Sequence, residues 1–151
     1  MSVRDRLAEL GLELPKVAAP VAAYVPAVRS GNHVYTAGQL PFADGALLRT
    51  GYVGGEVSPE DAKELAAVCA LNALAAVDSV VGLDNIVRIV KVVGFVASAQ
   101  GFTGQPGVIN GASELLGEVL GDAGVHARSA VGVSELPLGA PVELELIAEV
   151  R

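Results

Sequence analysis

This chain of 151 residues is poor in cysteine and in charged residues. Its one cysteine, Cys69, cannot form an intrachain disulfide, so we expect a reducing compartment. Charged residues make up 18% of the chain and hydrophobic residues 52%, which excludes a disordered protein. A domain of this size buries only about 70% of the surface of its unfolded chain. Because so few charges are available to cover the remainder, we expect an oligomer.

Basic residues are scarcer than acidic ones. The chain has 10 Lys and Arg against 17 Asp and Glu, a formal net charge of −7, and no Lys/Arg run. Such a protein has no general attraction for a phosphate backbone, so nucleic acid is not an expected partner. The charged N-terminus lacks a following signal core, and the longest charge-free stretch, residues 92–113, contains Gly, Pro, Gln, Asn and Ser. We therefore predict a cytoplasmic protein without a membrane span.

The order of predicted elements indicates an N-terminal extension followed by one α+β domain. A short amphipathic helix is expected at residues 3–10, and Pro15 and Pro20 bracket the linker after it. We therefore divide the chain into an extension, residues 1–19, and a domain, residues 20–151. Strands are predicted at residues 24–29, 33–37, 46–49, 86–97, 127–136 and 142–150, and helices at 58–81 and 108–120. This order favours one sheet with two helices packed on one face.

The longer predicted helix has a clear start. Ser58 can cap the free backbone N–H groups, and Pro59 is suited to the first turn. One apolar stripe is expected to contain Leu65, Val68, Asn72, Ala76 and Val80. For Asn72 we expect hydrogen bonds to neighbouring backbone rather than a ligand role.

Two predicted strands differ in their surroundings. Residues 86–97 are apolar on both faces, so we expect helices to cover one face and another subunit the other. The last strand alternates, with apolar residues facing one way and Glu143, Glu145 and Glu149 the other.

Most common catalytic motifs are missing. There is no Gly-Lys-Ser/Thr phosphate loop, and the pair Gly54-Gly55 opens no dinucleotide fingerprint. His33, His126 and Cys69 lack metal-ligand spacing, so we expect neither a metal nor a cofactor. We interpret His33 as a strand residue beside a turn and His126 as a strand-entry residue.

One group of residues could bind a ligand. Arg128 begins a predicted strand whose same-side neighbours, Ala130, Gly132 and Ser134, are all small, and a guanidinium above a small-residue floor can grip a carboxylate. Glu143 is predicted on the adjoining strand, with its side chain away from the apolar row. From composition alone, a solvated charge or an ion pair is the alternative for both.

Several segments, in order and at compatible spacing, resemble the RidA/YjgF family. They are YVPAV at residues 24–28, GN at 31–32, TAGQLP at 36–41, ARSAV at 127–131, LP at 136–137 and VELELIA at 142–148. The resemblance covers roughly residues 20–150 and implies a chorismate-mutase-like α+β subunit. It also implies a homotrimer with ligand sites in the clefts between subunits.

The resemblance further implies an activity without a cofactor. Family members hydrolyse reactive enamine and imine intermediates released by dehydratases, giving a 2-oxo acid and ammonia. Arg128 matches the arginine that holds the substrate carboxylate, and Glu143 matches the glutamate that positions the attacking water. Tyr24 matches a tyrosine lining the cleft, Asn110 aligns with an asparagine near the site, and Gly38 falls where the backbone approaches the ligand.

Two positions depart from the family and leave alternatives open. Ala37 and Ala130 stand where archetypal deaminases often have serine and cysteine, which makes the expected substrate cleft more apolar. The alternative to a deaminase is therefore a non-catalytic trimer that binds small carboxylates. An endoribonuclease, the family's older label, is disfavoured by the net charge of −7.

Overall fold

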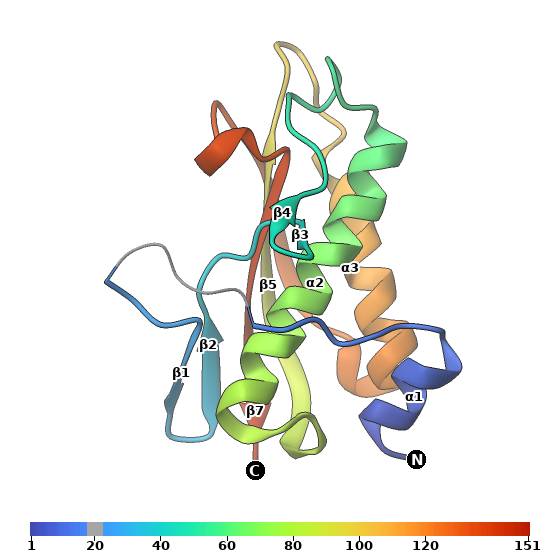
Figure 1. The fold of residues 1–151 in the computed structure, drawn as a ribbon, viewed down its shortest axis with the longest axis vertical. Helices are drawn as coiled ribbons and strands as arrows, with labels where there is room; N and C mark the ends of the chain where they lie inside the picture. The colour runs from blue at the N-terminus through green and yellow to red at the C-terminus, as the bar shows by residue number, and fades with distance from the viewer. Residues whose placement is uncertain (18–22) are drawn as a thin grey trace.

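The computed structural model describes residues 1–17 and 23–151, and a five-stranded sheet organises them (Figure 1). The strand order is β1-β2-β7-β5-β6, in which only β5 and β6 are parallel neighbours. The strands are β1 Ala27–Ser30, β2 His33–Thr36, β5 Ile86–Ala97, β6 Ala127–Val133 and β7 Val142–Val150, and a separate ladder pairs β3 Phe42–Ala43 with β4 Ala46–Leu47. The helices are α1 Val3–Glu9, α2 Pro59–Val81 and α3 Gln105–Leu120, with 3-10 turns η1 Leu83–Asn85, η2 Gly121–Gly124 and η3 Pro137–Gly139.

The predicted α+β class is confirmed, and most boundaries agree within a few residues. Strands β5 and β7 have the predicted bounds. Helix α3 begins three residues earlier than predicted, at Gln105, because Pro106 fits a first helical turn. The strand predicted at residues 127–136 ends at Val133, so Ser134 lies beyond it.

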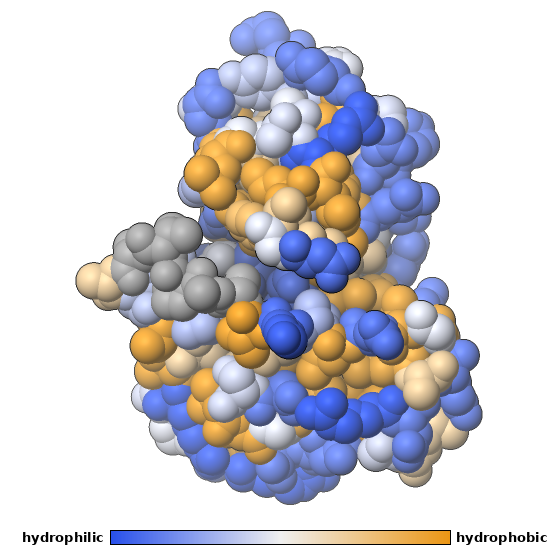
Figure 2. All heavy atoms as spheres, in the orientation of Figure 1, coloured by the Kyte–Doolittle hydropathy of each residue, from blue (hydrophilic) through white to orange (hydrophobic). Residues whose placement is uncertain are grey.

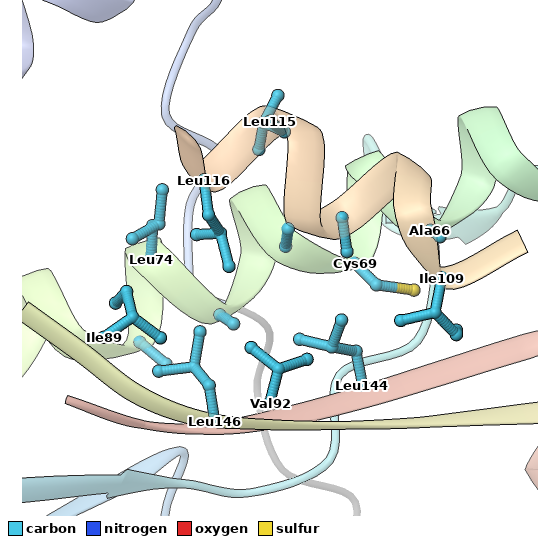
Figure 3. Close-up of a cluster of buried hydrophobic side chains, with 14 of the residues drawn as sticks. Ala66, Cys69, Leu74, Ile89, Val92, Ile109, Leu115, Leu116, Leu144 and Leu146 are labelled. Atoms are coloured by element: carbon cyan, nitrogen blue, oxygen red, sulfur yellow. The ribbon is translucent and has the colours of Figure 1, made fainter. Parts of the chain in front are cut away.

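The core lies between one face of the sheet and helices α2 and α3 (Figure 3). The alternation of β7 is confirmed, because every second residue from Val142 to Val150 is buried and apolar, and the residues between them, three glutamates and Ile147, are half-buried. Cys69 of α2 lies in this core, and burial raises the pKa of its thiol.

The predicted stripe on α2 is partly wrong. Val80 is 40% exposed, whereas a much wider set of residues is buried, including Ala70, Ala73 and Val77. The wider burial follows from two contacts, because α2 packs against both the sheet and α3. Asn72 behaves as predicted: it is 3% exposed and its Nδ2 donates to the carbonyls of Leu40 and Phe42, each at 3.1 Å.

Helix α2 is also, within the described part of the chain, the one helix long and apolar enough to cross a membrane. More than half of its most apolar window is buried inside the protein, as in a core helix. On the face seen in Figure 1, apolar residues gather across the middle of the molecule, and hydrophilic residues predominate at both ends (Figure 2).

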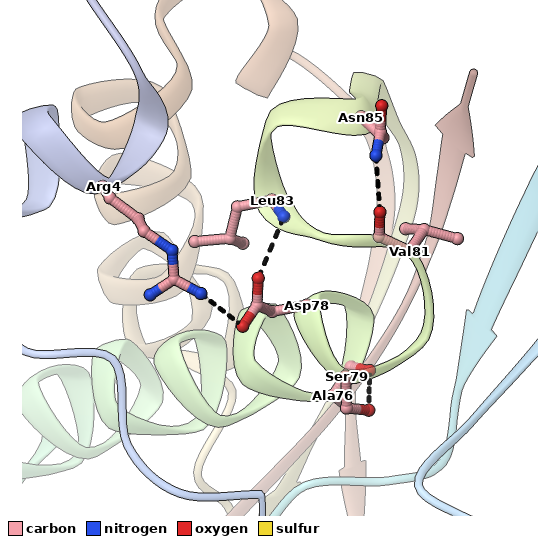
Figure 4. Close-up of polar contacts among 7 residues, drawn as sticks. All are labelled: Arg4, Ala76, Asp78, Ser79, Val81, Leu83 and Asn85. Carbon is pink, nitrogen blue, oxygen red and sulfur yellow. Dashed lines mark hydrogen bonds and ion pairs between the residues drawn. The ribbon is translucent and has the colours of Figure 1, made fainter.

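The N-terminal helix α1 covers the outside of the helix layer. A reciprocal pair of hydrogen bonds between Ser2 and Asp5 caps it, and Leu7 is buried at 3% exposure. Arg4 pairs with Asp78 at 2.7 Å near the end of α2, and the other oxygen of Asp78 accepts from the Leu83 backbone (Figure 4). The expected boundary at residues 19 and 20 lies outside the described residues, so that division stays a prediction.

Helices α2 and α3 are in close contact at Gly111, where a Cβ would overlap the backbone carbonyl of Lys63. We expect Gly111→Ala to destabilise the fold by about 2 kcal/mol, because backbone atoms cannot move aside cheaply. Gly117 of the same helix is the matched control, since a Cβ there meets nothing within 4 Å. Gly117→Ala should be neutral or stabilising by up to about 1 kcal/mol. Urea unfolding of both variants measures the difference, and equal midpoints would contradict this account.

Candidate functional site

Arg128 lies on the edge strand β6, on the face covered by helices. Its register partner on β5 is Val92, which is fully buried beneath the helices, so the two side chains share that face. The guanidinium makes two hydrogen bonds to α3. Nη1 donates to the Ser113 hydroxyl at 3.1 Å, and Nη2 donates to the Pro106 carbonyl at 3.0 Å.

A histidine continues this network. His126 Nε2 lies 2.9 Å from Ser113 Oγ, and His126 Nδ1 lies 2.6 Å from the carbonyl of Gly124. Sequence reasoning placed His126 correctly at the entry of β6 but missed Ser113. The only signal was spacing: Pro106, Asn110 and Ser113 share one helix face at i, i+4 and i+7, provided that the helix starts at Gln105.

The other residues predicted beside Arg128 fit this setting. Asn110 is exposed and lies between Pro106 and Ser113 on the same face of α3. Ala130 follows Arg128 on the same side of β6, half-buried and packed against the core.

Arg128 has no carboxylate within ion-pair distance among residues 1–17 and 23–151. A guanidinium carries five N–H donors, and the two hydrogen bonds above use two of them. Three donors are therefore left for an anionic ligand.

Glu143 is the centre of a second group of predicted residues. The backbones of Gln39 and Leu144 bond reciprocally, at 2.7 and 3.0 Å, which brings the preceding Gly38 against Glu143. A Cβ at Gly38 would overlap Oε2 of Glu143 and lie 2.8 Å from its Cδ. Only glycine therefore leaves room for the carboxylate in this position.

The remaining predicted residues, Ala37 and Tyr24, lie on the two sides of the first hairpin, and Ala37 directly precedes Gly38. The Ala37 backbone N–H donates to the carbonyl of Pro26 at 2.8 Å. Tyr24 lies two residues before Pro26 and is 48% exposed. The second group is thus formed by β7 and the segment that leads into and out of the first hairpin.

Burial is the main cause that raises the pKa of the Glu143 carboxyl, and the neighbouring charge of Glu145 adds to it. The two side chains point to the same face of β7 because they are two residues apart. Glu143 therefore holds its proton at a higher pH than an exposed glutamate does.

The prediction that Arg128 and Glu143 lie on adjoining strands is wrong. Strand β5 lies between β6 and β7, so the two residues are two strand spacings apart, about 9–10 Å. Their side chains also point to opposite faces, because Arg128 shares the helix-covered face with Val92 while Glu143 alternates with the buried row of β7. These residues therefore belong to two separate groups on opposite faces of the sheet.

Two surface hollows lie elsewhere. One of about 580 Å³ and one of about 340 Å³ share Tyr52 in their lining, and neither is lined by Arg128 or Glu143. The Tyr52 hydroxyl donates to the Glu135 carboxylate, and this hydrogen bond is the main cause that raises the pKa of Tyr52. Within the described residues, no group of three or more His, Cys, Asp or Glu side chains could hold a metal ion.

Comparison with known proteins adds independent information. The family described as "YjgF/chorismate_mutase-like, putative endoribonuclease" matches residues 4–150. The Trypanosoma cruzi protein TCP17 is 41% identical over 151 residues, which cover 99% of this chain and 94% of that protein.

Two solved structures are also similar. The Agrobacterium tumefaciens protein Atu1372, of unknown function, is 45% identical with a TM-score of 0.92, covering 99% of this chain and 92% of that one. The E. coli protein TdcF, solved with bound serine, is 25% identical with a TM-score of 0.67, covering 91% of this chain and 94% of that one.

The causes of the raised Glu143 pKa make a testable prediction. Glu145→Gln should lower the pKa of Glu143, because it removes the neighbouring charge, whereas Glu149→Gln, further along the same face, should leave it unchanged. Carbon-detected NMR titration of the carboxyl measures both values. Equal shifts in the two variants would contradict the assignment to Glu145.

The raised pKa of Glu143 also predicts how the free energy of unfolding changes with pH. A raised folded-state pKa means that the native state binds more protons than the unfolded chain, so this group's contribution falls as pH rises from the unfolded toward the folded pKa. We expect Glu143→Gln to unfold at a higher temperature than the wild type at pH 7, and the difference to vanish below about pH 4. Calorimetry at both pH values measures it, and a lower melting temperature at pH 7 would contradict it.

Proposed function

Because this chain belongs to the YjgF/chorismate-mutase-like family, we propose that it hydrolyses small reactive enamines and imines to 2-oxo acids and ammonia. The substrates are of the 2-aminoacrylate and 2-iminobutanoate type. One observation supports this most directly: the fixed guanidinium of Arg128 has three donors left and no carboxylate of the described residues beside it.

The chemistry needs only these side chains and water. Arg128 binds the substrate carboxylate through two N–H groups, which fixes the position of the imine carbon. Glu143 accepts a proton from water as the water oxygen bonds to that carbon, and the imine nitrogen takes up a proton. Glu143 then returns its proton to the amine of the resulting carbinolamine, the C–N bond breaks, ammonia leaves and the hydroxyl proton is lost to water to give the 2-oxo acid. An enamine such as 2-aminoacrylate enters this sequence after it has become the imine, by taking a proton from water on its terminal carbon and losing one from nitrogen.

The raised pKa of Glu143 suits this role. A carboxylate whose pKa is raised accepts a proton from water more readily than one with an ordinary carboxyl pKa. Burial and the charge of Glu145 both raise the pKa of Glu143, which makes its carboxylate a stronger base.

We further propose that the site forms between subunits of a homotrimer. The Arg128 half-site, on the helix-covered face, must meet the Glu143 half-site of another copy, since the two point to opposite faces of one sheet. Contact between two different patches is heterologous, and a heterologous contact that closes makes a ring. The exposed apolar residues Val28, Tyr35 and Val131, on the face opposite the helices, offer a surface for this contact.

The E. coli relative supports the substrate class. TdcF was solved with bound serine, a small amino acid whose carboxylate is the group that Arg128 is suited to hold. The single buried cysteine is compatible with the cytoplasmic location that we propose for this reaction.

A binding protein without turnover is the second candidate. It is favoured by Ala37 and Ala130, which offer no side-chain hydrogen bond to a ligand. Measuring ammonia release beside binding of 2-oxobutanoate separates the two: binding without ammonia identifies the non-catalytic protein. Cleavage of RNA that is lost with Arg128→Ala would instead support the endoribonuclease named in the family description.

The role of Arg128 leads to a direct test. We expect Arg128→Ala to abolish 2-iminobutanoate hydrolysis in a coupled dehydratase assay, because no other group replaces the carboxylate anchor. Size-exclusion chromatography with light scattering should show an unchanged trimer. Unchanged activity of this variant would reject the assignment of Arg128.

Sharing of the site between subunits has its own test. Arg128→Ala and Glu143→Gln are each expected to be inactive, but co-assembled mixtures should recover about a quarter of the wild-type activity. In a ring of three, every mixed trimer has one contact that joins an intact Arg128 to an intact Glu143, and random assembly makes about three quarters of trimers mixed. No recovery after co-refolding into confirmed mixed trimers would contradict a shared site.

A further inference from the structure

We propose that Ser113 and His126 are positioning residues that hold the Arg128 guanidinium in its ligand-binding orientation. This inference rests on the proposed function, because it concerns how the same carboxylate anchor is prepared. It adds two residues, from α3 and from the start of β6, that sequence reasoning gave no role in binding.

The network has a defined direction. The Gly124 carbonyl can only accept, so His126 Nδ1 carries the proton and Nε2 is the acceptor in the neutral ring. The Ser113 hydroxyl therefore donates to His126 Nε2, and its oxygen accepts from Arg128 Nη1. The bond to Gly124 thus fixes the tautomer of His126, and His126 in turn orients the Ser113 hydroxyl so that its oxygen accepts from Arg128.

The far end of the network is rigid. Gly124 is buried, and a Cβ there would overlap the backbone carbonyl of Leu116, so η2 lies tightly against α3. The next residue is also held, since Arg88 Nη2 donates to the Val125 carbonyl at 3.3 Å. His126 therefore bonds to an acceptor that cannot easily shift.

Arg128 needs such support because it lies on an edge strand and its side chain is long. Both anchors are on α3, at the Pro106 carbonyl and the Ser113 hydroxyl, so the planar fork is held at both terminal nitrogens. A side chain fixed before binding loses less rotamer freedom when the ligand arrives, which increases affinity. The effect belongs mainly to substrate binding and less to the chemical step.

The test is a double-mutant cycle read by binding of 2-oxobutanoate, a non-reacting carboxylate, in calorimetry. Ser113→Ala should weaken binding about tenfold and raise KM more than it lowers kcat, because a hydrogen bond to a charged group is lost. Ser113→Thr keeps the hydroxyl and should restore affinity to within about threefold of the wild type. His126→Phe, which keeps a ring without nitrogen acceptors, should weaken binding about three- to tenfold.

Two controls test whether a change in affinity arises from the contact between Ser113 and Arg128. Ser79→Ala removes a helical hydroxyl that bonds only to its own helix, at the Ala76 carbonyl, and should leave affinity unchanged (Figure 4). In the Arg128→Ala background, Ser113→Ala should have no further effect, because positioning residues act through Arg128. Thermal melting and light scattering confirm that each variant is folded and assembled.

The outcomes separate this inference from the proposed function. If Arg128→Ala weakens binding to a low residual level but Ser113→Ala binds like the wild type, positioning is overturned and the proposed function stands. If Ser113→Ala weakens residual binding equally with and without Arg128, the residues act independently and positioning is again overturned. If Arg128→Ala leaves both binding and turnover intact, the proposed function itself fails.

Discussion

The packing of α2 and α3 on a single face of the sheet is the constraint on which the other features depend. It divides the polar residues of the strands into two populations. Arg128, on the covered face at the sheet edge, finds hydrogen-bond acceptors on α3. Glu143, on the opposite face, has acidic neighbours at Glu145 and Glu149, and the described helices α2 and α3 pack against the other face. The close approach at Gly111 fixes how near the two helices can lie, and therefore where the acceptors on α3 are placed.

This division leaves two opposite charges of one protomer unable to neutralise each other. A buried or half-buried charge is stable only when it finds compensation, and here neither residue finds an ionic partner in its own described chain. The Arg128 guanidinium has three N–H donors that are not used by its two hydrogen bonds to α3, and the pKa of the Glu143 carboxyl is raised. Both properties are useful to an enzyme and of little use to a protein that needs only to fold.

The elements were predictable from the sequence, but their neighbours were not. The alternation of β7, the Ser58 cap and the backbone partners of Asn72 all follow from local chemistry, and the structure confirms them. The placement of Glu143 beside Arg128 was wrong because strand order is a long-range property: β5 precedes α3 in the chain yet lies between β6 and β7. Ser113 was missed because its role depends on the facing strand, which spacing along one helix does not specify.

Asn72 connects the interior to the segment beside Glu143. Its single amide nitrogen holds the carbonyls of Leu40 and Phe42, and Gly38 is only two residues before the first of them. These hydrogen bonds attach the turn beside the Glu143 carboxylate to the middle of α2. The packing of α2 in the core therefore limits how far this turn can move. Substitutions on α2 that touch no ligand can therefore alter the surroundings of Glu143, and with them the binding that we propose there.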